Sequence, residues 1–186
     1  PFIGPNDFAM DNQGGIYFSA SGAFDTAAPI TGKLYYRSAE GNIHMVAENL
    51  HYPNGVALIE DGLTLLVNEH LAQKITSYNV LDNGDLVNPQ IFAELIFQEE
   101  DEPDDYTGPD GLAVDASDFI YVCLFGLGEI QVLSPEAEFL YSIPVPSPFV
   151  TNASFNPDQT MLYVTAVDDA WSSPYPGKVF VISFQE

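Results

Sequence analysis

The chain repeats one short pattern four times, and this repeat limits its fold more than any other feature. Each copy starts with a turn carrying an asparagine or aspartate, continues as a short apolar strand and leads through a second turn into another apolar strand. The copies begin at Pro5, Pro53, Pro109 and Thr151. They are roughly 40 to 56 residues apart, near the period of a four-stranded propeller blade. The repeat therefore predicts a chain built from β-propeller blades.

The alternation of apolar and polar residues divides the chain into four units. Each unit is predicted to hold four antiparallel strands, except the last, which holds three. The units cover about residues 6–50, 54–97, 110–146 and 152–186 of one incomplete propeller domain, 1–186. Asn83-Gly84 is a strong hairpin signal, and we expect only a short strand after it, near residues 90–92. No stretch combines helical periodicity with helix caps, so we predict an all-β fold of four-stranded antiparallel blades.

The chain is strongly acidic, with 27 Asp and Glu against 4 Lys and Arg and a net charge of −23. Such a surface repels phosphate backbones and anionic lipids, so nucleic acid and membranes are disfavoured as partners and cations are favoured. An acidic surface that keeps a protein soluble at high salt is the open alternative. The acidic run at residues 98–105 is interpreted as a solvated loop or as a rim that collects cations.

Several other classes of protein find no support in the sequence. Cys123 is the single cysteine, and its place in an apolar strand indicates packing rather than catalysis. There is no Gly-x-Ser-x-Gly motif, phosphate-binding glycine loop or Cys-x-x-Cys motif. No apolar run approaches the ~18 residues of a membrane span. We therefore expect a soluble protein whose compartment, cytoplasmic, periplasmic or secreted, is unknown.

The repeat predicts a shared polar site. In a propeller the first strand of each blade lines the central channel, and the residue leading into it lies at one mouth of that channel. The side-chain oxygens at this register belong to Asn6, Asn54, Asp110 and Asn152, with Asp7 next to Asn6. Amide and carboxylate oxygens suit a hard cation such as Ca²⁺. The alternative is that these residues only form turns, but their recurrence in all four units favours a site.

Four motifs carry a resemblance to a known family. They are Gly4-Pro5-Asn6-Asp7, Tyr52-Pro53-Asn54-Gly55, Gly108-Pro109-Asp110-Gly111 and Thr151-Asn152-Ala153. Together with the strands that follow, they resemble the SMP-30/gluconolactonase/luciferin-regenerating-enzyme-like family over nearly the whole chain. The resemblance implies a six-bladed propeller, of which this chain holds about four blades. It also implies a metal-dependent hydrolase that acts mostly on lactones.

The resemblance implies a role for each residue of the polar site. Asn54 is similar to a metal ligand of the family, and Asp110 to a carboxylate ligand that is also a candidate general base or nucleophile. Asn6 resembles a residue that binds the metal or the metal-bound substrate, and Asp7 its acidic neighbour, an alternative group for proton transfer. Asn152 matches a position near the substrate pocket. Ca²⁺ is the implied cofactor, with Zn²⁺, Mn²⁺ or Mg²⁺ as other divalent ions.

The family also has parts that we expect outside this chain. Two further blades and a glutamate metal ligand are expected upstream of Pro1 or on another chain. The function predicted is the opening of a small lactone or ester, with the cation as Lewis acid. A non-catalytic propeller that binds a ligand or protein, with the cation only joining blades, is the alternative. Other pocket candidates are His51, Glu69, His70 and Trp171, whereas His44 is expected on an outer strand.

Overall fold

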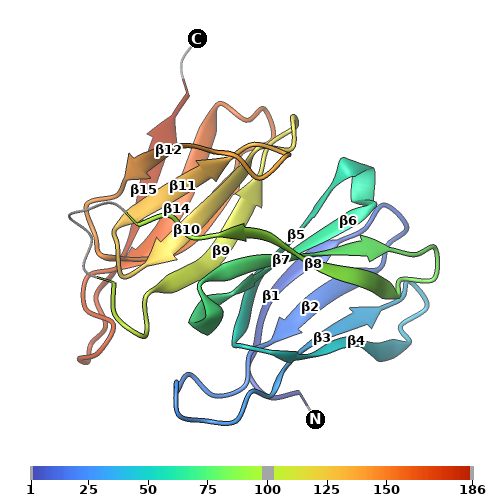
Figure 1. Ribbon diagram of the computed structural model, residues 1–186. Helices are drawn as coiled ribbons and strands as arrows, with labels where there is room; N and C mark the ends of the chain where they lie inside the picture. The colour runs from blue at the N-terminus through green and yellow to red at the C-terminus, as the bar shows by residue number, and fades with distance from the viewer. Residues whose placement is uncertain (1, 98–102, 185–186) are drawn as a thin grey trace. The chain divides into compact units, whose positions relative to one another are not determined.

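The computed structural model describes residues 2–97 and 103–184, which form fifteen β-strands and two short 3₁₀ helices (Figure 1). No helix in this part of the chain is long and apolar enough to cross a bilayer. The chain divides into two compact units, Pro1–Leu95 and Ile96–Glu186, each described by itself below. The predicted all-β fold of four-stranded antiparallel sheets is confirmed. The acidic rim predicted at residues 98–105 lies largely outside the described residues.

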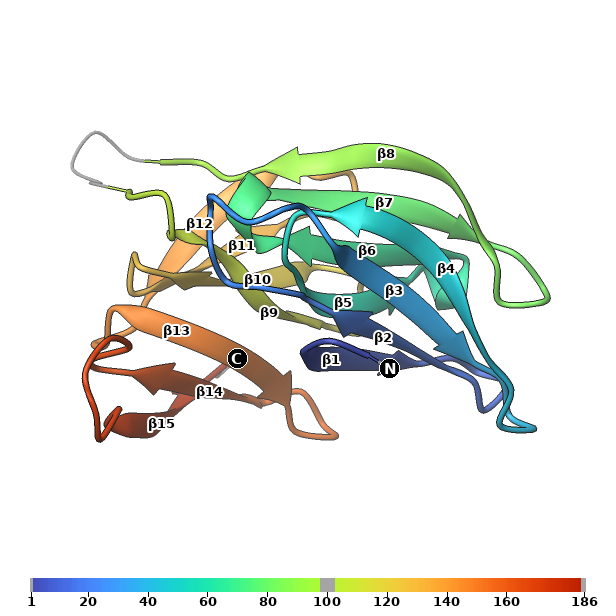
Figure 2. The ribbon, with the colours of Figure 1, turned by 90° about the horizontal axis from the view of Figure 1, so that it is seen from below.

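The first unit holds two four-stranded antiparallel sheets, each with its strands in chain order. The strands of the first sheet are β1 (Pro5–Met10), β2 (Ile16–Ala20), β3 (Gly32–Arg37) and β4 (Ile43–Leu50). Those of the second are β5 (Pro53–Ile59), β6 (Thr64–Glu69), β7 (Lys74–Val80) and β8 (Leu86–Glu94). The helices η1 (Glu60–Gly62) and η2 (His70–Ala72) flank β6. Figure 2 shows the strands of each sheet side by side in chain order.

The strand expected near residues 90–92 is longer than predicted. β8 runs from Leu86 to Glu94 and contains Pro89. Proline cannot donate a ladder hydrogen bond, but it is tolerated on an edge strand. β8 is an edge strand of its sheet, so the proline interrupts nothing.

The second unit is a single seven-stranded sheet in which two blades are joined. Its strands are β9 (Gly108–Val114), β10 (Ile120–Phe125), β11 (Glu129–Leu133), β12 (Phe139–Pro144), β13 (Phe149–Phe155), β14 (Met161–Val167) and β15 (Gly177–Ser183). The join between the blades is one residue pair, Phe125 with Phe149. Trp171 packs edge-to-face near both of these rings. The last repeat holds three strands among the described residues, as the sequence predicts.

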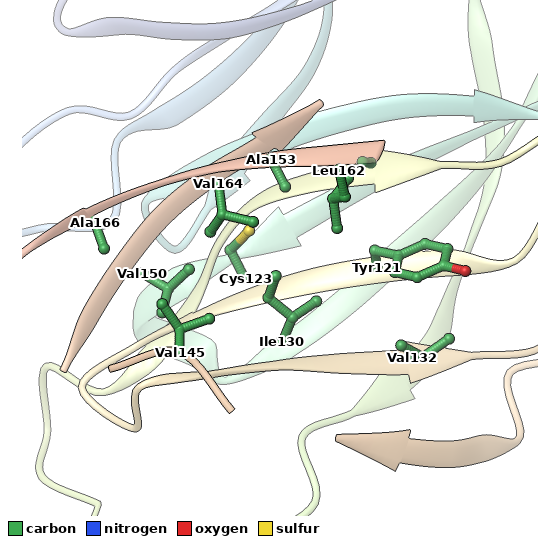
Figure 3. Packing of buried hydrophobic residues seen from close by; sticks show 11 residues of the cluster. Tyr121, Cys123, Ile130, Val132, Val145, Val150, Ala153, Leu162, Val164 and Ala166 are labelled. Atoms are coloured by element: carbon green, nitrogen blue, oxygen red, sulfur yellow. The ribbon is translucent and has the colours of Figure 1, made fainter. Parts of the chain in front are cut away.

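Each unit has its own apolar core. In the first unit the core includes Tyr17 and Leu34 of the first sheet and Leu65 and Val67 of the second, all fully buried. In the second unit, side chains of β9 to β11 meet those of β13 and β14, and Cys123 lies beside Val164 (Figure 3). The apolar strands of the repeat thus pack sheet against sheet within a unit. This packing places the start of one blade's first strand beside the preceding blade.

Candidate functional site

A β-bulge lies at each candidate position, and the sequence did not predict it. In β1 the three-residue step from Pro5 to Phe8 faces a two-residue step on β2, so Asn6 and Asp7 lie opposite Ser19. The ladder has matching irregularities at Pro53/Val56, at Leu112/Pro109 and at Val150/Asn152. A bulge re-aims the side chains of the strand that carries it. The four blade starts therefore carry bulges at one register.

In the last bulge, however, Thr151 takes the first position and Asn152 the second, the place of Asp7 and Gly111. The prediction that aligned Asn152 with Asn54 was therefore wrong by one residue.

Asn54 is the most enclosed of the predicted ligands. The residue is 4% exposed, and its side-chain amide makes no hydrogen bond within residues 2–97 and 103–184. The amide is not among the fully buried polar groups left without a partner, so it is open to a small amount of solvent. An amide that reaches solvent and has no protein partner is available to a ligand or to water. The amide oxygen is a suitable ligand for a hard cation. This buried amide fits the metal-ligand role that the sequence predicts for Asn54.

Asn6 and Asp7 lie next to the strand that carries Asn54. The amide nitrogen of Asn6 donates to the hydroxyl of Ser21 at 3.2 Å, and Asn6 itself is exposed. The two carboxylate oxygens of Asp7 accept backbone N–H groups, one from Phe8 at 2.9 Å and one from Val56 at 3.2 Å. Asp7 therefore links β1 to β5. These bonds hold the carboxylate in place.

Asp110 and Asn152 are brought together in the second unit. Asp110 is half-buried and is followed by Gly111. A Cβ atom on Gly111 would lie 2.3 Å from the side-chain oxygen of Asn152, so the bulge of β9 packs directly against β13. That oxygen of Asn152 accepts the N–H of Ala153 at 2.8 Å. The glycine is thus needed for this close approach.

The structure places Asn6, Asp7 and Asn54 in the first unit and Asp110 and Asn152 in the second. Each group is close-packed by itself. A single cation shared by Asn54 and Asp110 stays a prediction. No group of three or more His, Cys, Asp or Glu side chains gathers among the described residues. A cation here would therefore depend on amide oxygens as well as carboxylates, the donor set of a hard divalent ion.

The secondary pocket candidates make structural contacts. The buried carboxylate of Glu69 accepts the hydroxyl of Thr76 and the N–H of His51, and it pairs with Lys74 at 3.2 Å. His70 is 1% exposed and packs edge-to-face on Phe24 and Tyr52. His44 lies on β4, as predicted for an outer strand, and contacts Asp85 at 2.9 Å. Glu69 thus supports the turn that leads into β5.

Sequence reasoning missed two buried serines at the end of β2. Ser19 donates to the carbonyl oxygen of Asn54 at 2.8 Å, and the residue two positions on, Ser21, donates to that of Pro53 at 2.7 Å. They are 0% and 3% exposed. Residues two apart along an extended chain point to the same side, so the spacing of Ser19 and Ser21 indicates that both hydroxyls face one neighbour. Their partners depend on which strand lies opposite that face, and the repeat alone does not give this.

The four-stranded antiparallel blades and the repeated bulge define a class of protein, the β-propeller type. Residues 1–168 match the family model described as SMP-30/Gluconolactonase/LRE-like region. The chain belongs to this family. The predicted resemblance is confirmed.

Individual relatives agree with this assignment. The chain is 30% identical to the lactonase drp35 of Staphylococcus saprophyticus over 97% of its own length and 56% of the relative's. A gluconolactonase structure from Xanthomonas campestris matches with a TM-score of 0.72 at 26% identity, over 88% of this chain and 55% of that one. A calcium-binding regucalcin from Agrobacterium tumefaciens matches at 0.80 and 19% identity, over 96% and 60%. The chain thus spans just over half the length of these relatives.

Proposed function

We propose that this chain is part of a metal-dependent hydrolase that opens lactones. The observation that carries the proposal is the nearly buried side chain of Asn54, whose amide makes no hydrogen bond among the described residues and is therefore available to an ion. The resemblance of Asn54 to a metal ligand of the family supports the same assignment. Membership of the family and the 30% identity to a lactonase support the same reaction class. Calcium is the proposed ion, supported by the oxygen-only donors and by the calcium-binding relative.

In the proposed site, Asn54 and Asp110 hold the ion, and Asn6 assists in holding it or the substrate bound to it. Asn152, at the start of β13, orients the substrate. The bound cation supplies Lewis-acid polarisation of the lactone carbonyl. The chain's own residues would align the lactone ring, keep its carbonyl oxygen toward the ion and exclude part of the solvent.

Asp110 is the proposed general base or nucleophile. Its carboxylate takes a proton from the attacking water, or attacks the carbonyl carbon itself. Asp7 is the second candidate for this proton transfer. Both oxygens of Asp7 already accept backbone N–H groups, which tie this carboxylate to β1 and β5. The resemblance of Asp110 to the family's carboxylate ligand favours Asp110 for the proton transfer.

The remaining blades and the family's glutamate ligand are proposed to come from upstream sequence or another chain. Large apolar side chains are exposed on the first and last strands, where Phe8 is 62% and Val179 67% exposed. Exposed apolar faces of this kind mark surfaces that pack against another element. The chain's coverage of 56% of the lactonase relative supports the same proposal.

The test is the opening of δ-gluconolactone, followed by proton release at constant pH with Ca²⁺ and with a chelator. We expect Asp110→Asn to lower kcat by about 10²- to 10⁴-fold if the carboxylate acts as base. Asp105→Asn is the matched control, because Asp105 is an exposed aspartate of the same unit. Bound metal is measured on each variant, so that loss of the ion is separated from loss of the base.

Two outcomes would count against the proposal. Full activity of Asp110→Asn at normal metal content removes the acid-base role. Cation binding by the wild type without turnover of lactones or esters favours the alternative, a non-catalytic propeller in which the ion only joins blades and the site binds a ligand or protein.

A further inference from the structure

The backbone that carries Asn54 is held from the preceding sheet by three side chains. Ser21 donates to the carbonyl oxygen of Pro53, Ser19 donates to that of Asn54, and Asp7 accepts the N–H of Val56. Asp7 lies on β1 and Ser19 on β2, and Ser21 directly follows the end of β2. The main chain at the start of β5 is therefore fixed at Pro53, Asn54 and Val56 by separate hydrogen bonds.

Ser19 is the central member of this set. It lies opposite the bulge formed by Asn6 and Asp7, and it accepts the N–H of Asp7 at 3.1 Å. Its hydroxyl lies 2.8 Å from the carbonyl oxygen of Asn54 and 3.4 Å from that of Asp7. A hydroxyl has one proton, and the shorter contact takes it. Ser19 thus connects the bulge of one blade to the bulge of the next.

The position of the Asn54 side chain depends on this connection. Its amide has no hydrogen-bond partner in the described part of the chain, so only its backbone and packing orient it. The direction of the side chain follows from the position of the Cα atom and the peptide planes on either side. The Ser19 bond fixes one of those planes at the carbonyl of Asn54 itself. A buried hydrogen bond of this kind limits rotation of the plane.

The repeat indicates that the fold itself does not require a hydroxyl at this register. In β6 the residue opposite the bulge is Asn68, and in β10 it is Cys123. Both of these residues are 0% exposed, as is Ser19. Three different side chains therefore satisfy the same packing position. The serine is explained better by what it holds than by the space it fills.

We propose that Ser19 is a positioning residue that orients the Asn54 amide toward the bound cation. The inference deepens the proposed function, since it rests on Asn54 being a ligand. Ser19 does not touch the ion or the substrate. It acts only through the main chain of Asn54.

The test compares Ser19→Ala and Ser19→Cys with the wild-type chain. Cysteine keeps nearly the volume of serine but is a weak donor. We expect the Ca²⁺ dissociation constant, measured by calorimetry, to rise by about 10- to 100-fold in both variants, the usual loss when the support of a metal ligand is removed. Terbium luminescence gives a second measurement of the same affinity.

Thr64→Val is the matched control. Thr64 is also buried, in the same hairpin, and its hydroxyl donates to Glu60 at 2.7 Å. It pairs with Ile59, at the opposite end of β5 from Asn54. We expect this variant to lose stability but to bind Ca²⁺ within about twofold of the wild type, since a purely structural defect leaves the ligand in place.

A readout without metal separates this inference from the proposed function. In the metal-free protein, the NH₂ signals of Asn54 in a ¹⁵N–¹H correlation spectrum are expected to shift or broaden in Ser19→Ala and to stay unchanged in Thr64→Val. Unchanged signals and unchanged affinity in Ser19→Ala overturn the inference. If the wild type binds no Ca²⁺ and opens no lactone, the proposed function fails, and the Asn54 signals still decide whether Ser19 positions the amide.

Discussion

In the first unit the start of β5 is held by hydroxyl groups and a carboxylate, whereas in the second unit the start of β13 is reached by direct backbone approach. Ser19 bonds to the carbonyl of Asn54, whereas in the second unit Gly111 lies against Asn152 with no room for a side chain. The repeat register is the same in both. One position of a propeller blade can therefore be fixed by polar bonds or by close packing.

The residues at this register explain the difference. Asp7 occupies the second bulge position in the first blade, and Gly111 occupies it in the third. The residue opposite is Ser19 in one and Cys123 in the other. Cys123 lies within the apolar core of the second unit (Figure 3). The two positions thus change together: Asp7 faces Ser19 in the first blade, and Gly111 faces Cys123 in the third.

Breaking the close approach in the second unit is expected to have the largest effect. In Gly111→Ala the new methyl group would lie 2.3 Å from the side-chain oxygen and 2.8 Å from the Cα atom of Asn152. Overpacking of this kind costs about 1–3 kcal/mol of unfolding free energy. Urea unfolding followed by the fluorescence of Trp171, the single tryptophan, measures the loss.

Gly177→Ala is the control for that experiment. Its methyl group would meet only the carbonyl oxygen of Ala166 at 3.7 Å, an ordinary contact. We expect a change within about 0.5 kcal/mol. Equal stability of the two variants would show that the approach of Gly111 to Asn152 is not tight.

Replacing Cys123, the residue opposite the bulge of β9, by serine tests whether the second unit tolerates the side chain that the first unit has at this position. Cys123→Ser places a hydroxyl among Val150, Ile130 and Val164. We expect a loss of about 1–3 kcal/mol, because a hydroxyl is poorly solvated in an apolar core. The same unfolding experiment measures it, with Cys123→Ala as the comparison for the lost sulfur. If Cys123→Ser is as stable as the wild type, the second unit tolerates a serine at this position as the first unit does.

A smaller, pH-dependent effect is expected at the other end of β1. Burial tends to raise the pKa of Asp11, but hydrogen bonds from the Tyr36 hydroxyl and from the N–H groups of Gln13 and Gly15 outweigh it and lower the pKa. Burial and the Asp11 carboxylate raise the pKa of Tyr36 to about 12, so its hydroxyl keeps its proton.

A pKa lowered by folding gives stability that is present above the unfolded value and lost as the pH falls through the folded one. We expect Asp11→Asn to cost on the order of 1 kcal/mol at pH 7 and progressively less below about pH 4. Urea unfolding followed by circular dichroism at pH 7, 5 and 3 measures the difference. A difference that does not change with pH would contradict the role of this carboxylate.

Most of the fold could be predicted from the sequence, because apolar alternation and Gly/Asn turns are local signals. The all-β class was predicted in this way, whereas β8 is longer than the strand expected near residues 90–92. The bulges were not predicted, since one extra residue in a strand start leaves the apolar pattern almost unchanged. They became visible only through the pairing of Pro5 and Phe8 with their partners.

The candidate site was predicted in part. The repeat register singled out Asn54 and Asp110, but it could not show that Asn54 is nearly buried or that Asp7 bonds to Val56. The role of Ser19 depends on a contact 35 residues away in the chain. Such contacts follow from how two sheets pack, which local patterns do not encode.

The bond from Ser19 to Asn54 has a consequence for exchanging modules between relatives. A chimera joined at the turn between β4 and β5 would take Asn54 from one parent and the residue at position 19 from the other. Grafts that move β1 and β2 together with β5 keep the donor and acceptor from one parent. The smallest transferable piece in this half of the chain is thus larger than one blade and begins before Asp7.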